Sequence, residues 1–366
     1  MPKNKRPAPR KNPTPPADKD ELLSQELCSF ALAQDPELGY AVRRYLKQQK
    51  DAVLYGAIEL ARSEDADAYR ALKDAVEEAA GTVLLHKGDG PEMEINAFAI
   101  PVFVHSQGGL RQQECFTDEA AYAALLDSFT SAGLESPKAK VVLVQHAYEL
   151  DAARRISYTQ LNAMAREAAA AMMDKKIAEA PTLQRSITDW QPSAFGAGDE
   201  AVELRFLLGF ALKRADDPFY TVPPEGKQQD AWFEARMQRY QDWTVAAAPL
   251  VQRCLAAGRS VSLNFMYQDL FYGALQQGQS ELGMLAMMAE LREAMPSSGP
   301  ARAVITLSDL GDDLALHVHL VGEAGELAAS ERALDVGADV EAEIEDIRDA
   351  LGTLGIADVT VELTAP

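Results

Sequence analysis

Two segments of this chain, residues 94–106 and 201–214, alternate apolar side chains with a period of two, and they constrain the fold more than any other feature. A period of two places alternate side chains on one face, which indicates a half-buried β-strand. The first face carries Phe98, Ile100, Val102 and Val104, and the second carries Val202, Leu204, Phe206, Leu208, Phe210 and Leu212. Each strand pattern is followed by a helical pattern, a second strand pattern and a second helical pattern, so the order β-α-β-α occurs twice.

The two halves can be superposed residue by residue. Phe98 falls on Phe206, and Pro101 falls on Gly209. Proline and glycine both weaken a strand ladder, so the superposition predicts a bulge at the same place in both strands. We infer an internal duplication of a β-α-β-α unit with parallel crossover connections.

The segments on either side of these repeats have patterns of their own. Helical spacing before the repeats predicts a layer of three helices, one of which runs through residues 38–60. The last segment predicts a small β-β-β-α-β module that either stands alone or extends the main sheet. The fold class is therefore α/β (α+β), with a basic tail at 1–17, a helical layer at 18–90, repeats at 91–180 and 198–296, and an acidic module at 300–366.

Charge is distributed unevenly along the 366 residues, which carry a formal net charge of -21. Residues 301–366 hold 15 acidic and 3 basic residues, so the body of the protein is expected to repel a phosphate backbone. The proline-rich tail has no acidic residue, and its composition predicts disorder. It is either a solubilising leader or an electrostatic tether to RNA, DNA or an acidic partner, through Lys3, Lys5, Arg6, Arg10 and Lys11.

Several features that the sequence lacks limit the class of protein. No run of 18 apolar residues occurs, and the basic N-terminus has no apolar signal-peptide region, so neither membrane insertion nor export by a signal peptide is predicted. Cys28, Cys115 and Cys254 form no CxxC pair, which favours a reducing cytoplasm over a disulfide scaffold or a zinc site. We expect a cytoplasmic protein without a cofactor.

The segment ALHVHL raises the question of a metal site, because His317 and His319 share one strand face. Zinc needs three or four ligands, and the nearby acidic residues lie too far along the chain to supply them. Pairing Leu316 with Ile305 in a hairpin would place His319 opposite Arg302, a cation that opposes a metal. Histidines that face solvent or a partner are favoured, and a metal site is the alternative.

A cleft at the ends of the second strands is the main site hypothesis. In open α/β sheets, ligands bind beyond the C-terminal ends of parallel strands. His146 itself falls on Phe265 in the superposition, which predicts an inward-facing core histidine. The candidate site residues are Tyr148, Glu149, Asp151, Arg154 and Arg155 in the first half and Tyr267, Gln268 and Asp269 in the second.

The segments INAFAIPVFVHSQGG and VQHAYELDAARRISYTQLNAM resemble members of an uncharacterised bacterial domain-of-unknown-function family of similar length with a basic, proline-rich leader. The resemblance implies a bacterial cytoplasmic protein and carries no activity. We therefore expect a non-enzymatic binding or regulatory protein that presents a face or cleft of the duplicated sheet to a protein or small molecule.

The alternative function is an enzyme acting on a small anionic substrate. Glu149 or Asp269 would then be the acid/base, and Arg154 or Arg155 would hold the substrate. Burial of Glu149 and Arg154 in a closed pocket would favour the enzyme, and an open surface would favour the binding protein.

Overall fold

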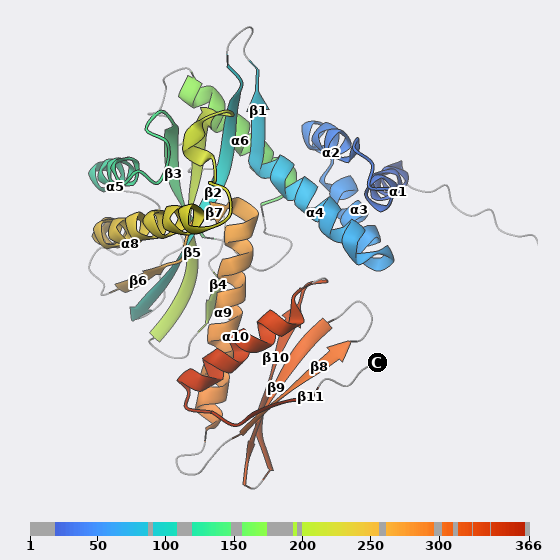
Figure 1. Cartoon of the computed structure of the whole chain (residues 1–366), viewed down its shortest axis with the longest axis vertical. Helices are drawn as coiled ribbons and strands as arrows, with labels where there is room; N and C mark the ends of the chain where they lie inside the picture. The colour runs from blue at the N-terminus through green and yellow to red at the C-terminus, as the bar shows by residue number, and fades with distance from the viewer. Residues whose placement is uncertain are drawn as a thin grey trace, which may run out of the picture.

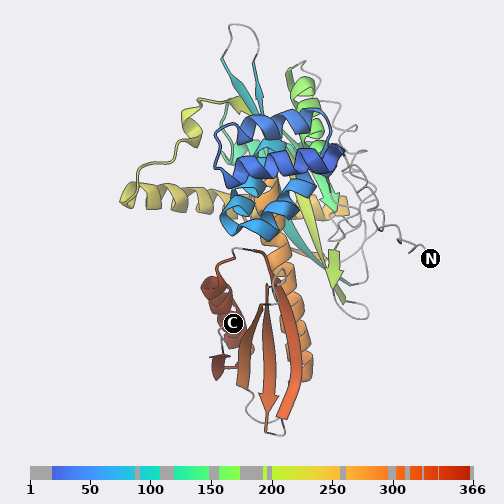
Figure 2. The ribbon, with the colours of Figure 1, turned by 90° about the vertical axis from the view of Figure 1, so that its right-hand side faces the viewer.

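The computed structural model describes residues 19–86, 91–107, 119–147, 156–173, 193–195, 200–255, 261–295, 302–309, 314–323, 325–336 and 338–362. These residues form a helical layer, a seven-stranded sheet with helices on both faces, and a separate four-stranded sheet at one end (Figures 1 and 2). The mixed α/β class expected from the patterns is confirmed. The basic tail lies outside the described residues.

The N-terminal layer has four helices where the sequence predicted three: α1 (Lys19–Leu32), α2 (Leu38–Lys47), α3 (Asp51–Glu64) and α4 (Ala66–Gly81). The predicted run through 38–60 is divided because Gln49 has a left-handed backbone with φ of 56°. A tertiary contact then fixes the start of α3, since the Asp51 carboxylate accepts a hydrogen bond of 3.0 Å from the backbone N–H of Thr159. The apolar spacing of the sequence continues across this break and therefore does not reveal it.

The large sheet is antiparallel at every described pairing. It contains β1 (Thr82–Leu85), β2 (Met93–Gln107), β3 (Lys140–Ala147), β4 (Ser193–Phe195), β5 (Glu200–Arg214), β6 (Val261–Phe265) and β7 (Asp269–Leu270). Strands β2 and β5 pair at the centre; β3 lies beside β5, whereas β6 and β7 lie beside β2. Strands β2 and β3 therefore run in the same direction with β5 inserted between them. In the same way, β5 and β6 are parallel with β2 between them, so each crossover connection passes over one strand of the sheet.

The residue-by-residue superposition of the halves is wrong. Phe98 pairs with Gly209 and Pro101 pairs with Phe206, so the two phenylalanines lie on opposite faces of the sheet. Phe98 packs in one core cluster and Phe206 in another. A one-residue slip in alignment moves every side chain of a strand to the other face, which is the error made here. The β2–β5 ladder is also continuous, so the predicted bulge is absent from it.

The second strands do not correspond as predicted either. The superposition of His146 on Phe265 also places Val142 on Val261. In the structure, Val142 pairs with Phe210 of β5. The predicted superposition places Phe210 on Val102, and Val102 pairs with Phe265, so these pairings would match Val142 with Phe265 and not with Val261. The predicted superposition of the second strands therefore disagrees with that of the first strands by four residues. The comparison with Phe265 gives no support for a core position of His146, whose side chain lies outside the described set. A common origin of the halves stays a prediction.

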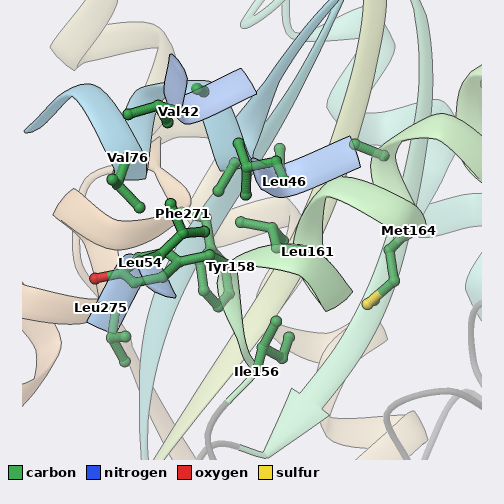
Figure 3. Packing of buried hydrophobic residues seen from close by; sticks show 14 of the residues in the cluster. Val42, Leu46, Leu54, Val76, Ile156, Tyr158, Leu161, Met164, Phe271 and Leu275 are labelled. Atoms are coloured by element: carbon green, nitrogen blue, oxygen red, sulfur yellow. The ribbon is translucent and has the colours of Figure 1, made fainter. Parts of the chain in front are cut away.

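Two apolar cores cover the two faces of the sheet. On one face, α5 (Glu119–Ser131) and α8 (Lys227–Leu255) pack over β2 and β5. On the other, α6 (Tyr158–Met173) and α9 (Phe271–Ala294) pack together with the N-terminal layer. Figure 3 shows this second core, in which Leu46, Leu54 and Val76 approach Leu161 and Phe271.

The C-terminal module has the predicted β-β-β-α-β order: β8 (Arg302–Asp309), β9 (Leu314–Gly322), β10 (Gly325–Leu334), α10 (Val340–Thr353) and β11 (Val359–Glu362). Its strands form a sheet of their own, in the order β10-β9-β8-β11. Helix α9 runs from the large sheet to this module (Figure 1), where Met284, Met287 and Leu291 enter the module's core. No described helix combines the length and apolar character needed to cross a bilayer.

Candidate ligand pocket

The predicted site residues fall into two groups in the structure. Tyr148, Glu149, Asp151, Arg154 and Arg155 lie outside the described residues. Tyr267 and Gln268 connect β6 to β7, and Asp269 begins β7 beside β2. The ends of β3 and β6 lie on opposite edges of the four-strand row β3-β5-β2-β6, three strand spacings or roughly 14 Å apart. The strand order thus gives no support to a cleft shared by the two groups.

A pocket of about 260 Å³ does include the second group. Its floor is the α5/α8 face of the large sheet, where Asn96 pairs with Ala211 next to the Phe98–Gly209 pair. The other lining residues come from the loop after α5, the short helix η3 (Pro218–Tyr220), α8, and the β6–β7 connection. Those that contribute polar groups or rings are Glu135, Tyr220, Trp232, Phe233, Arg236, Tyr267, Gln268 and Asp269, and Lys213 joins them from β5.

Glu135 is the buried carboxylate of the pocket, with 8% of its surface exposed. Burial raises its pKa, and this is opposed by hydrogen bonds from Tyr220 and Gln268 and by the charges of Lys213 and Arg236. The Tyr220 hydroxyl donates to Oε2 of Glu135 at 2.5 Å. The carboxylate is therefore held in place as a hydrogen-bond acceptor.

The loop that carries Glu135 is fastened to η3. Ser136 donates from Oγ to Asp217 at 2.7 Å and from its backbone N–H to the Tyr220 hydroxyl at 3.2 Å. The Asp217 carboxylate also accepts from the backbone N–H of Phe219, at 3.0 Å, inside the η3 turn. These contacts position Tyr220 and Glu135 together at the pocket.

Two cations lie near the carboxylate. The Lys213 ammonium is 3.6 Å from the centroid of the Tyr220 ring and 3.5 Å from a carboxylate oxygen of Glu94. The Arg236 guanidinium lies 4.7 Å from the centroid of the Trp232 ring and donates to the Leu134 carbonyl at 3.3 Å. Both cations contact aromatic rings and keep further N–H groups near the pocket.

Two buried side-chain oxygens of the lining have no hydrogen-bond partner among the described residues: Oδ1 of Asn96 and Oε1 of Gln268. The hydrogen bond from the Gln268 amide to Glu135 fixes the orientation of that amide, so Oε1 is left as an acceptor. A buried polar atom without a partner costs about 1–3 kcal/mol, and such atoms are rare in folded proteins. Both oxygens have almost no accessible surface, so they lie behind the wall of the pocket and are not open to a ligand.

Asp269 belongs to the exposed rim of the pocket rather than to its interior. Oδ1 accepts from the backbone N–H of Leu270 at 2.7 Å, and a Cβ at Gly273 would come within 2.4 Å of Oδ2. The carboxylate thus packs against the first turn of α9, where the helix dipole favours a negative charge. This position explains Asp269 as a structural group and gives no support for a role as acid/base.

The histidine pair has a different register from the predicted one. His317 pairs with Thr306 and His319 with Val304, whereas Arg302 pairs with Val321. The prediction was wrong by two residues, a shift that alternation cannot detect because it keeps each side chain on the same face.

A neighbouring side chain gives each imidazole a hydrogen-bond partner. Nε2 of His317 is 2.8 Å from Oγ of Ser308, and Nδ1 of His319 is 3.1 Å from Oε2 of Glu326. Their side chains are 29% and 31% exposed. Within the described ranges no group of three His, Cys, Asp or Glu residues could hold a metal ion.

A second, larger cavity of about 660 Å³ lies where α4, α9 and β10 meet. Asp335 accepts a hydrogen bond of 2.6 Å from the Tyr69 hydroxyl and another from Lys73. Arg332 donates to Oγ of Ser280 at 2.7 Å. These contacts fasten the C-terminal module to α4 and α9. Because Lys73 pairs with Asp335 and Arg332 pairs with Glu343, this cavity fits a structural junction.

Glu77 in this junction is expected to make stability depend on pH. Burial raises its pKa to about 7, with Lys73 opposing the shift and Asp74 and Asp335 adding to it. An unfolded glutamate ionises near pH 4.5, so the folded state loses stability as pH rises from about 4.5 to 7. Glu77→Gln should therefore stabilise the protein at pH 8 by on the order of 2 kcal/mol, and by little at pH 4, in urea unfolding at the two pH values. Equal effects at both would contradict this.

Comparison with known proteins gave no match to a family model, a curated protein or a solved structure. The resemblance to a bacterial family of unknown function stays a prediction.

Proposed function

We propose that the protein is a non-enzymatic binding protein that takes a small molecule into the pocket over β2 and β5, beside the β6–β7 connection. The lining of this pocket carries the proposal, because aromatic rings and the cations Lys213 and Arg236 surround a space of about 260 Å³. This mixture is typical of small-molecule sites. The cysteine pattern, with Cys28 free and buried, supports a reducing compartment, and we propose the bacterial cytoplasm.

Binding explains the pocket better than catalysis does. Glu135 is held by donors on both sides, from Tyr220 and Gln268, as a fixed acceptor. Asp269 packs against the start of α9. A regulatory role would follow if occupancy changes how α8 and the β6–β7 connection pack, because both line the pocket.

Filling the floor of the pocket tests the proposal. Ala211→Leu places a larger side chain beside Asn96. The probes are pooled L-amino acids, nucleosides, monosaccharides and short carboxylic acids, observed by saturation-transfer difference NMR with the full chain. We expect one class to bind the unchanged protein and to lose at least about tenfold in affinity with Ala211→Leu.

Ala52→Leu, at an exposed position of α3, is the matched control and should bind like the unchanged protein. Asn96→Leu is a second blocking variant in case Ala211→Leu fails to fold. The proposal is refuted if no class binds, or if the bound class is indifferent to both blocking variants.

A further inference from the structure

We infer that the groove between α9 and α10 is a docking site for an amphipathic helix of a basic partner protein. This groove has a volume of about 620 Å³ and is lined by the C-terminal half of α9 and the last turns of α10. Helix α10 lies beside α9 in the C-terminal module (Figure 1). The site is separate from the pocket over β2 and β5, so the inference goes beyond the proposed function.

The floor of the groove is apolar. Helix α9 contributes Leu285, Met288 and Ala289, whose helical spacing places them on one face, and α10 contributes Ala350 and Leu354. Leu285, Met288 and Leu354 are only half-buried, and Ala289 is exposed. An amphipathic helix covers such a floor by laying its apolar face into the groove. The flexible Met288 side chain can adapt to the side chains that enter.

The charged rim of the groove is acidic. Glu281 and Glu293 line it on α9 together with one cation, Arg292. On α10, Asp346 and Asp349 lie one turn before residues of the lining. None of these four carboxylates has an ion-pair partner among the described residues. Lysine or arginine residues beside the apolar face of a docked helix would supply the missing partners.

Two of these acids lie at the same end of the groove. Arg332 donates hydrogen bonds to Glu343 of α10 and to Ser280 of α9, so the first half of α10 lies beside that part of α9. Glu281 follows Ser280 in the chain, and Asp346 lies about one turn after Glu343. We therefore expect the basic residues of the partner helix at this end.

The basic tail of the chain itself does not match the groove. Residues 1–17 contain six prolines and no leucine, isoleucine, valine or aromatic residue. Proline breaks the interior of a helix, and this composition supplies no apolar face to cover the floor. A helix from another protein satisfies both the floor and the rim.

A designed helix tests the inference with the full chain. The probe is a fluorescein-labelled peptide of leucine, alanine and lysine, about 18 residues long, with its leucines on one face. One control peptide has the same composition in scrambled order, and the other has glutamate in place of lysine. In fluorescence anisotropy, we expect the helical lysine peptide to bind at least about tenfold more tightly than either control.

Variants of the floor locate the binding site. Met288→Gln should weaken binding of the lysine peptide at least about tenfold, because a polar side chain would be buried under the docked helix. Met237→Gln is the matched control, since Met237 is an exposed methionine of α8 outside the groove, and it should bind like the unchanged protein. Ala289→Lys changes an exposed lining position and should also weaken binding, which keeps the test open if Met288→Gln fails to fold.

Variants of the rim separate a local charge effect from a general one. Asp346→Asn should weaken binding of the lysine peptide by about two- to fivefold, the effect of one exposed ion pair. Glu341→Gln removes one charge from the opposite face of the same helix, where the side chain is exposed, and should leave binding unchanged.

Three results would overturn the inference. Equal binding of the helical and scrambled lysine peptides, or binding that is indifferent to both Met288→Gln and Ala289→Lys, would exclude a helix site in the groove. A glutamate peptide that binds as tightly as the lysine peptide would exclude a basic partner. A dimer of the unchanged chain in sedimentation velocity that is lost with Ala289→Lys would show that a second copy fills the groove.

Discussion

Gly209→Ala is expected to destabilise the protein by about 3 kcal/mol, because overpacking a filled core costs roughly this much. A Cβ at Gly209 would lie 2.1 Å from Cζ of Phe98, whose ring covers the glycine across the β2–β5 pair. The ring cannot move easily, because it stacks on Phe129 at a centroid distance of 5.6 Å, and Phe129 packs edge-on against Trp243 at 5.3 Å. Urea unfolding followed by circular dichroism measures the loss.

Gly352→Ala in α10 is the matched control, since nothing lies within 4 Å of a Cβ at that position. Alanine in place of glycine inside a helix should stabilise by about 0.5–1 kcal/mol. Phe98→Leu should relieve part of the cost of Gly209→Ala when the two are combined, as expected for residues in contact. A Gly209→Ala protein as stable as the unchanged chain would show that the ring does not occupy this space.

The strands themselves were largely predictable, but their order was not. Alternation located β2 and β5, and the C-terminal patterns gave β8 to β11 in the correct sequence. The pairing partner of a strand is set by packing in three dimensions, and a period of two is the same for any neighbour. The alternation therefore does not reveal that β5 lies between β2 and β3, or that β2 lies between β5 and β6.

The pocket was predictable only in part, because its residues come from distant segments. Gln268 was found as a residue near a strand end. Asn96 carried a signal that could have been used: it is polar at a position in register with Phe98 and Ile100, on a face that is otherwise apolar. Glu135, Lys213 and Tyr220 have ordinary loop and strand contexts, and only the folded chain brings them together.

Strand β5 also shows why both faces of a strand must be considered. Its alternation predicts that Val202, Leu204 and Phe206 face inward. The same pattern places Glu203 and Arg205 on the face expected to be exposed to solvent. Helices cover both faces of the sheet, and Glu203 and Arg205 are 3% and 2% exposed. They form an ion pair with Nη2 of Arg205 3.1 Å from Oε2 of Glu203. Burial of charge is tolerated because the two groups neutralise each other.

Breaking this pair should have the largest effect on stability of any single change considered for this chain. Glu203→Gln removes the carboxylate charge that pairs with the buried Arg205 guanidinium, and Arg205→Met removes the guanidinium that pairs with the buried Glu203 carboxylate, so each should cost about 3–5 kcal/mol in urea unfolding. The double variant should cost less than the two single costs added together, because the interaction between the two groups is then lost only once.

Asp216→Asn provides the control, since the Arg214–Asp216 pair of 2.7 Å near the end of the same strand is exposed, and its loss should change stability little. Single costs as small as that control, or costs that simply add, would mean that Glu203 and Arg205 do not depend on each other. Small single costs would also mean that water reaches the interior face of β5, which α5 and α8 cover in the structure.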